Sequence, residues 1–599
     1  MSVGSDASRV LSGHLRFLVK LLEKRWGDIA SGSLEPSNIC AMLNLPSSNA
    51  AAQHFLGTGE FKIIGIDGSM AQEEYLEMLL FYVCSLGYCG TMKVVKSGIE
   101  VDTSRAERDE TLSLTGSVPL WMEDLSNVNP EATTASEEFE VTRSIDSVSY
   151  ALMRLSELTL ALKAVQESGA RVLFVDGLLS SMYGPLMRDF RLLARGRSAL
   201  EGFDTPKGKL TKTDLILSAN LGPYPNFTPN RDVFSKYHML KYLLSVPADA
   251  WVTLDALESK YDNFSEANRG MTILNHRLND ELLEYDSGDK RIRIKSSARG
   301  YWDRVSWATS KLVSRIFGES KEYPLLLGEN HWITILDLSA LNLFTLLNLL
   351  GQAVNKKVLI IGIAKDTSAT DFVRSLLPAL LITKGATKSS PVVPRLHSDK
   401  AFLTMYSTIN FQKLQTPWRT VEYDYSFASA LSSIKDGKLV IRPARRIIGS
   451  EQAFIKSYFQ SRSSDLDPSV RTPVFVYDRP VYPDYDKELL REFEAKAFSH
   501  IFEIKPMIDA DGSSQIGNLV LRLLSLSDNP NVIEESGHNH LLFLADKHVK
   551  VISKQAGQMV KSVASLGLEG VVSKYKAYFV AKKFRELRSM YERLREVRQ

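Results

Sequence analysis

Three segments of this 599-residue chain are apolar on nearly every residue and end in an acid or a Lys-Asp pair. They are "KIIGIDGS" at residues 62–69, "RVLFVDG" at 171–177 and "KVLIIGIAKDT" at 357–367. A strand that is apolar on both faces is usually covered on both faces, as in the sheets of α/β proteins. The sequence therefore predicts an α/β fold in which polar groups emerge where these strands end.

Acidic side chains are expected at the ends of the first two strands. Asp67 and Asp176 precede Gly68 and Gly177, and glycine allows the backbone to turn sharply. Two carboxylates brought together repel each other unless a cation lies between them, and Mg²⁺ or Mn²⁺ prefer such oxygen ligands. Phosphodiester hydrolysis uses these ions to activate water and stabilise the leaving oxygen. Taken singly, each Asp-Gly pair is more typical of a turn, so the prediction depends on the combination.

Lys365 follows the third strand, in "AKDT". A lysine there could hold a phosphate or orient an attacking water. The alternative is a solvated strand end. Both readings stay open on the residues alone.

Composition indicates a soluble globular protein, with 44% hydrophobic and 24% charged residues. The net charge is only +3, so any nucleic-acid-binding surface must be local, as in residues 574–599, with nine Lys or Arg against three Glu. Cys40, Cys84 and Cys89 show no CxxC spacing, which favours a reducing cytoplasm. We expect no membrane contact, because no signal-peptide pattern opens the chain and no segment approaches the ~18 apolar residues of a membrane helix.

Several other chemistries have no motif support. The segment "GFDTPKGKL" misses both the spacing and the hydroxyl of a P-loop, so no internal ATPase site is predicted. No G-x-S-x-G or H-E-x-x-H motif occurs. His538 and His540 could bind a transition metal, but two such histidines on a loop are more typical of ordinary polar residues.

The rest of the chain divides by pattern. Apolar residues at helical spacing predict a helix over residues 145–165 that Gly169 can cap, and similar spacing occurs at 8–30 and 71–86. Residues 102–142 are rich in Asp, Glu, Ser and Thr, which indicates loops. Short β-like runs follow in residues 395–480, and helices close the chain.

Residues 233–300 are predicted to form an inserted winged-helix domain between core segments 1–232 and 301–599. Three helical stretches precede two short alternating runs joined by a Ser-Gly-Asp turn. In the second run Arg291, Arg293 and Lys295 are expected to point outward, as in a DNA-contacting wing. The alternative is a packing or protein-contact module.

The motifs "IIGIDGS", a helix glutamate, "RVLFVDG", "IIGIAKDTS" and a late "GHNHLLFLADKHVKVIS" follow one another as in the NurA nucleases, which this chain resembles from about residue 55 to about residue 565. The resemblance implies an RNase H-like (PIWI-like) core, a mixed sheet flanked by helices, and a homodimer. It implies Mn²⁺- or Mg²⁺-dependent hydrolysis of DNA, as a 5′ to 3′ exonuclease or a single-strand endonuclease. The implied partner is a HerA-type hexameric ATPase acting in DNA end resection, in the cytoplasm with the nucleoid.

The resemblance also assigns residues. Asp67, Glu157 and Asp176 match the metal carboxylates, and Lys365 matches a charge-stabilising lysine. Glu157 precedes Asp176 by nineteen residues, as the family's glutamate does, but it lies off the apolar stripe of its helix. Without the resemblance it reads as a solvated helix residue.

The late motif departs from the family pattern. Where many members have Tyr-Pro and then Ala-His, this chain has His538-Asn539 and then Ala545-Asp546. Asp546 can still give an oxygen to a metal, whereas His538 does not simply replace the tyrosine. His500 competes by residue type, but its surroundings match less well.

The sequence thus predicts a metal-dependent DNA nuclease with Asp67, Glu157, Asp176 and Asp546 as metal ligands. Two alternatives remain. One is an inactive NurA-like DNA-binding adaptor, which would bind DNA without cleaving it. The other is a nucleotide phosphohydrolase, which mononucleotides would inhibit at low concentration.

Overall fold

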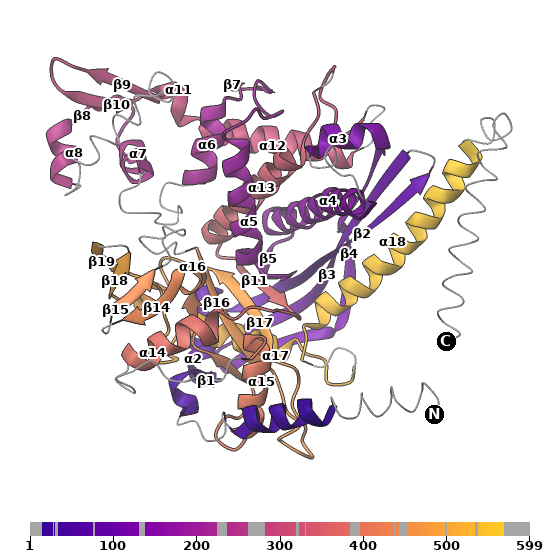
Figure 1. Ribbon diagram of the computed structural model, residues 1–599, viewed down its shortest axis with the longest axis vertical. Helices are drawn as coiled ribbons and strands as arrows, with labels where there is room; N and C mark the ends of the chain where they lie inside the picture. Colours follow the sequence, from indigo (N-terminus) through magenta and orange to yellow (C-terminus); the bar gives the residue numbers. More distant parts are fainter. Residues whose placement is uncertain are drawn as a thin grey trace.

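A ten-stranded mixed sheet forms the centre of the described part of the chain (Figure 1). The computed structural model describes residues 15–27, 29, 34–75, 78–130, 138–223, 236–260, 282–318, 323–329, 331–383, 396–435, 438–441, 453–497, 500–532 and 537–567. In order across the sheet the strands are β1 (Cys40–Met42), β12 (Trp418–Thr420), β16 (Phe454–Gln460), β17 (Phe475–Pro480), β11 (Leu359–Ala364), β5 (Ala170–Asp176), β2 (Gly59–Tyr75), β3 (Met78–Val95) and β4 (Gly98–Trp121), with β13 (Tyr423–Asp424) beside β16.

Helices cover both faces of this sheet. β5 runs parallel to β2 and β11, and β5, β11 and residues 63–67 of β2 are buried on both faces, as the apolar runs predict. Ile64 and Ile66 of β2 pack with α4 (Glu138–Glu167), α5 (Leu179–Leu193) and α13 (Ile335–Lys356). Ile63 packs on the other face with α2 (Leu45–Phe55), α17 (Gln515–Leu526) and α18 (His540–Gly567). The predicted α/β architecture with a mixed sheet flanked by helices is confirmed.

The long antiparallel strands β2, β3 and β4 differ from the sequence prediction. Residues 71–75 and 78–86, where helical spacing was noted, are strand, because Leu79, Phe81 and Val83 are buried with a period of two. Residues 102–121, where loops were expected, belong to β4 at the edge of the sheet. An edge strand has one uncovered side, so its polar residues can face solvent.

The predicted helix at residues 145–165 is confirmed within α4, and Gly169 ends the connection to β5 with a φ of +71°. α13 is the one described helix that is long and apolar enough to cross a membrane. This finding corrects the expectation that no segment approaches that length. α13 packs against α4 and α5 in the core, where Phe344 meets Phe190, which accounts for a helix apolar all round.

Smaller sheets and helices complete the fold. Figure 1 shows a four-stranded sheet at one side of the large sheet, formed by β14 (Leu431–Lys435), β15 (Lys438–Ile441), β18 (Phe493–Ala497) and β19 (His500–Ile504). The remaining helices include α6 (Lys212–Leu221), α12 (Tyr301–Phe317), the π-helix η5 (Phe372–Leu376), α14 (Leu377–Thr383), α15 (Asp399–Ile409) and α16 (Tyr425–Ala430). The three cysteines are free, as expected.

The region of the predicted insert stands apart from the large sheet in Figure 1. It contains α7 (Lys236–Ser245), α8 (Leu254–Lys260) and a three-stranded sheet of β8 (Val252–Thr253), β10 (Arg291–Ile294) and β9 (Leu283–Asp286). Ile292 and Ile294 are buried in a separate apolar cluster. The third predicted helix, at residues 265–280, lies outside the described residues, and so does the basic stretch at 574–599.

The arginines of the predicted wing are already paired. Arg291 and Arg293 lie over the ring of Trp251, at 5.0 and 4.5 Å from its centroid. Their guanidinium groups form ion pairs between 2.6 and 3.1 Å with three acids of the same hairpin, Asp286, Asp289 and Glu284. The charges of Arg291 and Arg293 are therefore balanced within the hairpin.

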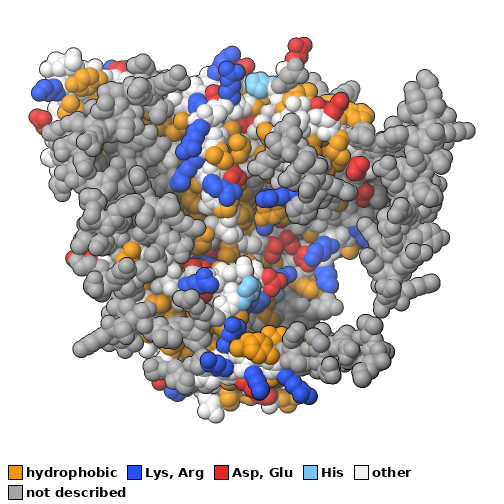
Figure 2. Space-filling model, viewed as in Figure 1, with side chains coloured by type: hydrophobic (Ala, Val, Ile, Leu, Met, Phe, Trp, Pro, Cys, Tyr) orange, Lys and Arg blue, Asp and Glu red, His pale blue; other side chains and the backbone are white. Residues whose placement is uncertain are grey.

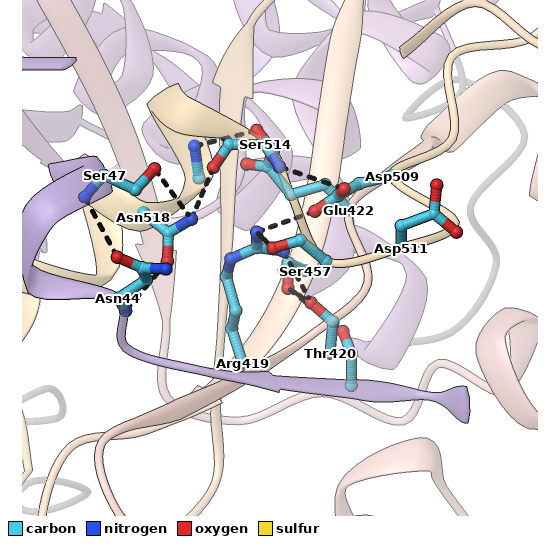
Figure 3. Close-up of polar contacts among 12 residues, drawn as sticks. Asn44, Ser47, Arg419, Thr420, Glu422, Ser457, Asp509, Asp511, Ser514 and Asn518 are labelled. Carbon is cyan, nitrogen blue, oxygen red and sulfur yellow. Dashed lines mark hydrogen bonds and ion pairs between the residues drawn. The ribbon is translucent and has the colours of Figure 1, made fainter. Parts of the chain in front are cut away.

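A fully buried charge network locks one half of the large sheet to α17 (Figure 3). Glu422 accepts hydrogen bonds from Arg479 at 2.8 and 2.9 Å and from the Ser514 hydroxyl at 2.6 Å. Arg419 pairs with Asp509 at 2.7 Å. Burial alone would raise the pKa of Glu422, but the neighbouring Arg479 and Arg419 lower it to about 2. The network ties β12 and β17 to the start of α17.

We expect Glu422→Gln to destabilise the fold by about 3 kcal/mol, because it removes one of the two carboxylates that pair with the buried Arg479. The folded pKa of about 2 lies below the ordinary value of 4.5, so Glu422 adds stability above pH 4.5 that is lost as pH falls toward 2. Thermal melting at neutral pH and at about pH 3 measures both effects. The control is Asp511→Asn, since Asp511 is 75% exposed; equal melting of the two variants would contradict the prediction.

Candidate metal centre

Asp67 and Asp176 lie on neighbouring parallel strands. Ile66 of β2 pairs with Val175 of β5, so the two acids occupy the next position on each strand. Alternation places both side chains on the sheet face that α18 covers, because Ile63 and Phe174 pack there. The predicted strand end is right for Asp176 and wrong for Asp67, since β2 continues to Tyr75.

Gly68 serves a different purpose from the predicted turn. A Cβ there would lie 2.6 Å from Glu157 Oε1 and 2.9 Å from Ser85 Oγ. Glu157, on α4, therefore reaches the sheet from the opposite face through the space that Gly68 leaves free. Glu157 is only 2% exposed, so it is not a solvated helix residue. The turn glycine is Gly177, with a φ of +85°.

Asp546 approaches from the other face on α18. That helix lies close to β2 because Gly65 has no side chain; a Cβ at Gly65 would be 2.6 Å from Leu541 Cβ. Lys365 follows β11, and its charge acts on Asp176. The structure thus brings the five predicted residues into one electrostatic neighbourhood. In Figure 2, acidic side chains gather near the middle of the visible face, with Lys and Arg side chains beside them.

Burial and neighbouring negative charges raise the pKa of the three most buried acids, Asp67, Glu157 and Asp176. Burial and then the negative charges of Asp176, Glu157 and Asp546 raise the pKa of Asp67 to about 8, although the Gly68 amide donates to it at 2.7 Å. Burial also raises the pKa of Glu157 and of Asp176, against the opposing effect of Arg154. No ion pair to Asp67 occurs among the described residues, so its charge is uncompensated.

Two cations that the sequence reading missed hold the outer carboxylates. Arg154 donates to Glu157 Oε2 at 2.6 Å and to the carbonyl of Asp176 at 3.1 Å. Lys550 contacts Asp546 at 2.7 Å. Helical spacing was the available signal, since these pairs are three and four residues apart on α4 and α18.

The donor set fits a divalent cation by its chemistry, since it offers four carboxylates and leaves Asp67 without a counter-charge. The side-chain positions do not form a closed ligand set. Within the described ranges, no group of three or more His, Cys, Asp or Glu side chains is placed to hold a metal ion. Arg154 holds Glu157 in its position, and Lys550 holds Asp546.

His538 is buried beside this centre and is 3% exposed. Burial, with the nearby charge of Lys365, lowers its pKa to about 3, so the imidazole is neutral. Its Nε2 atom has no hydrogen-bond partner in the part of the chain that the structure describes. His500 lies on β19 in the separate four-stranded sheet. Its backbone therefore belongs to a different sheet from the acids.

We expect Gly68→Ala to reduce the metal-dependent cleavage that the sequence predicts by about 10- to 100-fold, because the new methyl group displaces Glu157. Overpacking should also cost about 1–3 kcal/mol of stability. The control is Gly184→Ala in α5, where a Cβ meets nothing within 4 Å. That variant should melt at or above the wild-type temperature and cleave normally. Full activity of Gly68→Ala would show that Glu157 does not depend on this space.

Comparison with known proteins gives only distant likenesses. No family model matches the chain, and no curated protein matches it. The crystal structure of the NurA nuclease from Sulfolobus solfataricus is 10% identical, with 95% of this chain and 98% of that chain covered and a TM-score of 0.37. Crystal structures of NurA with manganese and of NurA bound to dAMP and manganese are each 12% identical, with TM-scores of 0.32. Each of these two alignments covers 92% of this chain. It covers 97% of the manganese-bound chain and 94% of the chain bound to dAMP and manganese. Likeness at this level does not establish the chemistry of this chain.

Proposed function

We propose that this chain is a metal-dependent deoxyribonuclease. The observation that carries the proposal is the convergence of three carboxylates, from α4, β5 and α18, around the unpaired and buried Asp67 of β2. Like charges gathered at such a cost are typical of a functional site, and a divalent cation is their natural counter-charge. The choice of DNA as the substrate rests on the motif order that resembles NurA nucleases.

In this proposal Asp67 and Asp176 hold the metal from one sheet face, with Asp546 beside them and Glu157 entering past Gly68. The bound Mn²⁺ or Mg²⁺ supplies activation of water and stabilisation of the leaving oxygen. Arg154 orients Glu157 through the 2.6 Å ion pair. Lys365 offsets negative charge on the phosphate, which the proximity of its charge to Asp176 supports.

The wider setting is also proposed from the resemblance. The core is then RNase H-like, residues 233–300 are a winged-helix insert, and the chain acts as a homodimer. A HerA-type hexameric ATPase would feed it DNA during end resection near the nucleoid, since no P-loop is present in the sequence. The cleavage would be 5′ to 3′ exonucleolytic, single-strand endonucleolytic, or both.

A second candidate function is an inactive DNA-binding adaptor. Two observations favour it: Arg154 and Lys550 already pair with Glu157 and Asp546, and an aspartate stands where many NurA nucleases have histidine. In that case the cations take the place of the metal. The adaptor would bind DNA without cleaving it.

The deciding experiment measures cleavage of end-labelled single- and double-stranded DNA by the full chain with Mn²⁺, Mg²⁺ or EDTA. Metal-dependent cleavage that EDTA abolishes supports the nuclease. No cleavage under any condition, even with a HerA-type ATPase and ATP added, overturns it in favour of the adaptor. Inhibition by mononucleotides at low concentration would instead indicate a nucleotide phosphohydrolase.

A further inference from the structure

A local excess of positive charge lies between α5 and the start of α6. Residues 188–212 contain seven Lys or Arg against three Asp or Glu, an excess of four, although the whole chain carries only +3. We call its cations the α5 basic row: Arg188, Arg191, Arg195, Arg197, Lys207, Lys209 and Lys212. Figure 2 shows Lys and Arg side chains in a line over the region of α5, α6 and the hairpin of β6 (Asp204–Thr205) and β7 (Gly208–Lys209).

Four members of the α5 basic row are free to meet a ligand. Arg191, Arg195, Arg197 and Lys209 are exposed, and no ion pair to them occurs among the described residues. The other three are engaged: Arg188 with Asp189, Lys207 with Asp303, and Lys212 with the carbonyl of Gly196. The Lys212 contact fixes the turn that carries Arg195 and Arg197, at 2.6 Å.

The spacing of the row makes one continuous surface. Arg188, Arg191 and Arg195 are three and four residues apart, and the turn after α5 continues the helical course because the Arg195 amide donates to the Leu192 carbonyl at 3.0 Å. Cations at the C-terminus of a helix also interact favourably with the helix dipole. That effect fades within the last turn, so it does not account for Arg197 or Lys209.

The row is connected to the metal centre through α5. This helix begins at Leu179, three residues after Asp176. Its fifteen residues span about 22 Å, which equals about six base pairs of duplex at 3.4 Å each. The row therefore lies near the far end of α5, at a distance from the end of β5 that equals about half a helical turn of duplex.

We propose that the α5 basic row binds the phosphate backbone of DNA on its way to the metal centre, an inference that rests on the proposed nuclease function. Free arginines suit phosphates because their planar donors match phosphate oxygens. A protein interface would need an apolar centre, but Leu192 is the only large exposed apolar side chain in this segment. The paired wing arginines, Arg291 and Arg293, offer a phosphate far less.

The test measures DNA binding by the full chain in EDTA. The readout is the fluorescence anisotropy of a labelled duplex over about 50–200 mM salt. The test variant is Arg191→Ala/Arg195→Ala/Arg197→Ala. Each phosphate contact removed lowers the salt slope by about one, so the slope should fall by about three and the affinity by about tenfold or more. Arg291→Ala/Arg293→Ala should bind like the wild type.

The matched control removes three exposed cations from β3, β4 and their turn: Lys93→Ala/Lys96→Ala/Arg105→Ala. Equal melting temperatures establish that both triple variants are folded. Equal DNA binding by the two triple variants overturns the inference, and so does a wild type that binds no DNA. Either result leaves an acidic protein as the ligand of the α5 basic row. Row-dependent binding without cleavage in Mn²⁺ supports the row while the nuclease fails, so the two failures are distinguishable.

Discussion

Asp67→Asn and Asp176→Asn should each lower metal-dependent DNA cleavage by about 10²–10³-fold or more, because each removes a charge that would hold the metal. Asparagine keeps the shape of aspartate but carries no charge, so the effect reports on the carboxylate itself. End-labelled DNA with Mn²⁺, Mg²⁺ or EDTA gives the rates. Asp546→Asn should have a smaller effect, since Asp546 is 20% exposed and already pairs with Lys550.

The control for these variants is Asp366→Asn. Asp366 follows Lys365 directly, but it is 97% exposed and contacts Lys400. It should therefore leave the rate unchanged. If Asp67→Asn and Asp176→Asn both retained wild-type rates, the four carboxylates would not be a metal site, and a catalytic role for this edge of the sheet would be wrong.

The strands and helix nearest the metal centre are predictable because their patterns are local. β5 and β11 are apolar on nearly every residue, and α4 repeats its apolar residues every three or four positions. These elements place Asp176 and Lys365 without any knowledge of the rest of the fold. A pattern within one strand or helix is enough to predict that element when it is buried in the same way along its whole length.

The long strands β2, β3 and β4 were harder to predict. Asp67-Gly68 has the composition of a turn, yet it lies inside β2, where Gly68 makes room for Glu157. The polar residues of β4 suggested a loop, because only its position at the sheet edge explains how they stay solvated. Both features depend on what packs against the strand.

Buried charges were the least visible part of the site in the sequence. Glu157 lies off the apolar stripe of α4, and only the gap at Gly68 explains its burial. Arg419 and Arg479 are also fully buried, each paired with acids from distant segments. A charged residue is usually read as surface, so partners that are remote in sequence cannot be predicted from its own neighbourhood.

The raised pKa of Asp67 implies that this site destabilises the metal-free protein. Its pKa rises from an ordinary value of 3.8 to about 8 on folding. Folding therefore takes up a proton between these two values, and stability falls as pH rises from about 4 to 8. At about 1.4 kcal/mol per pKa unit, the charged carboxylate costs on the order of 5 kcal/mol once pH reaches 8. Below pH 4 the cost is absent.

Asp67→Asn should consequently raise the melting temperature in EDTA at pH 8 and have little effect at pH 4. Mn²⁺ should shrink this difference, because it supplies the missing counter-charge to the wild type: an ion at 100 times its Kd adds about 2.7 kcal/mol, about half of the cost. Thermal melting with and without Mn²⁺ measures both the cost of the Asp67 charge and the stabilisation by the ion. Asp366→Asn is the exposed control. If the wild type and Asp67→Asn melted together across this pH range, Asp67 would be paired in solution. If Mn²⁺ stabilised both equally, the ion would bind elsewhere. A melting difference that grows with pH and shrinks with Mn²⁺ would link the cost of the acidic cluster to its use as a metal site, independently of any cleavage assay.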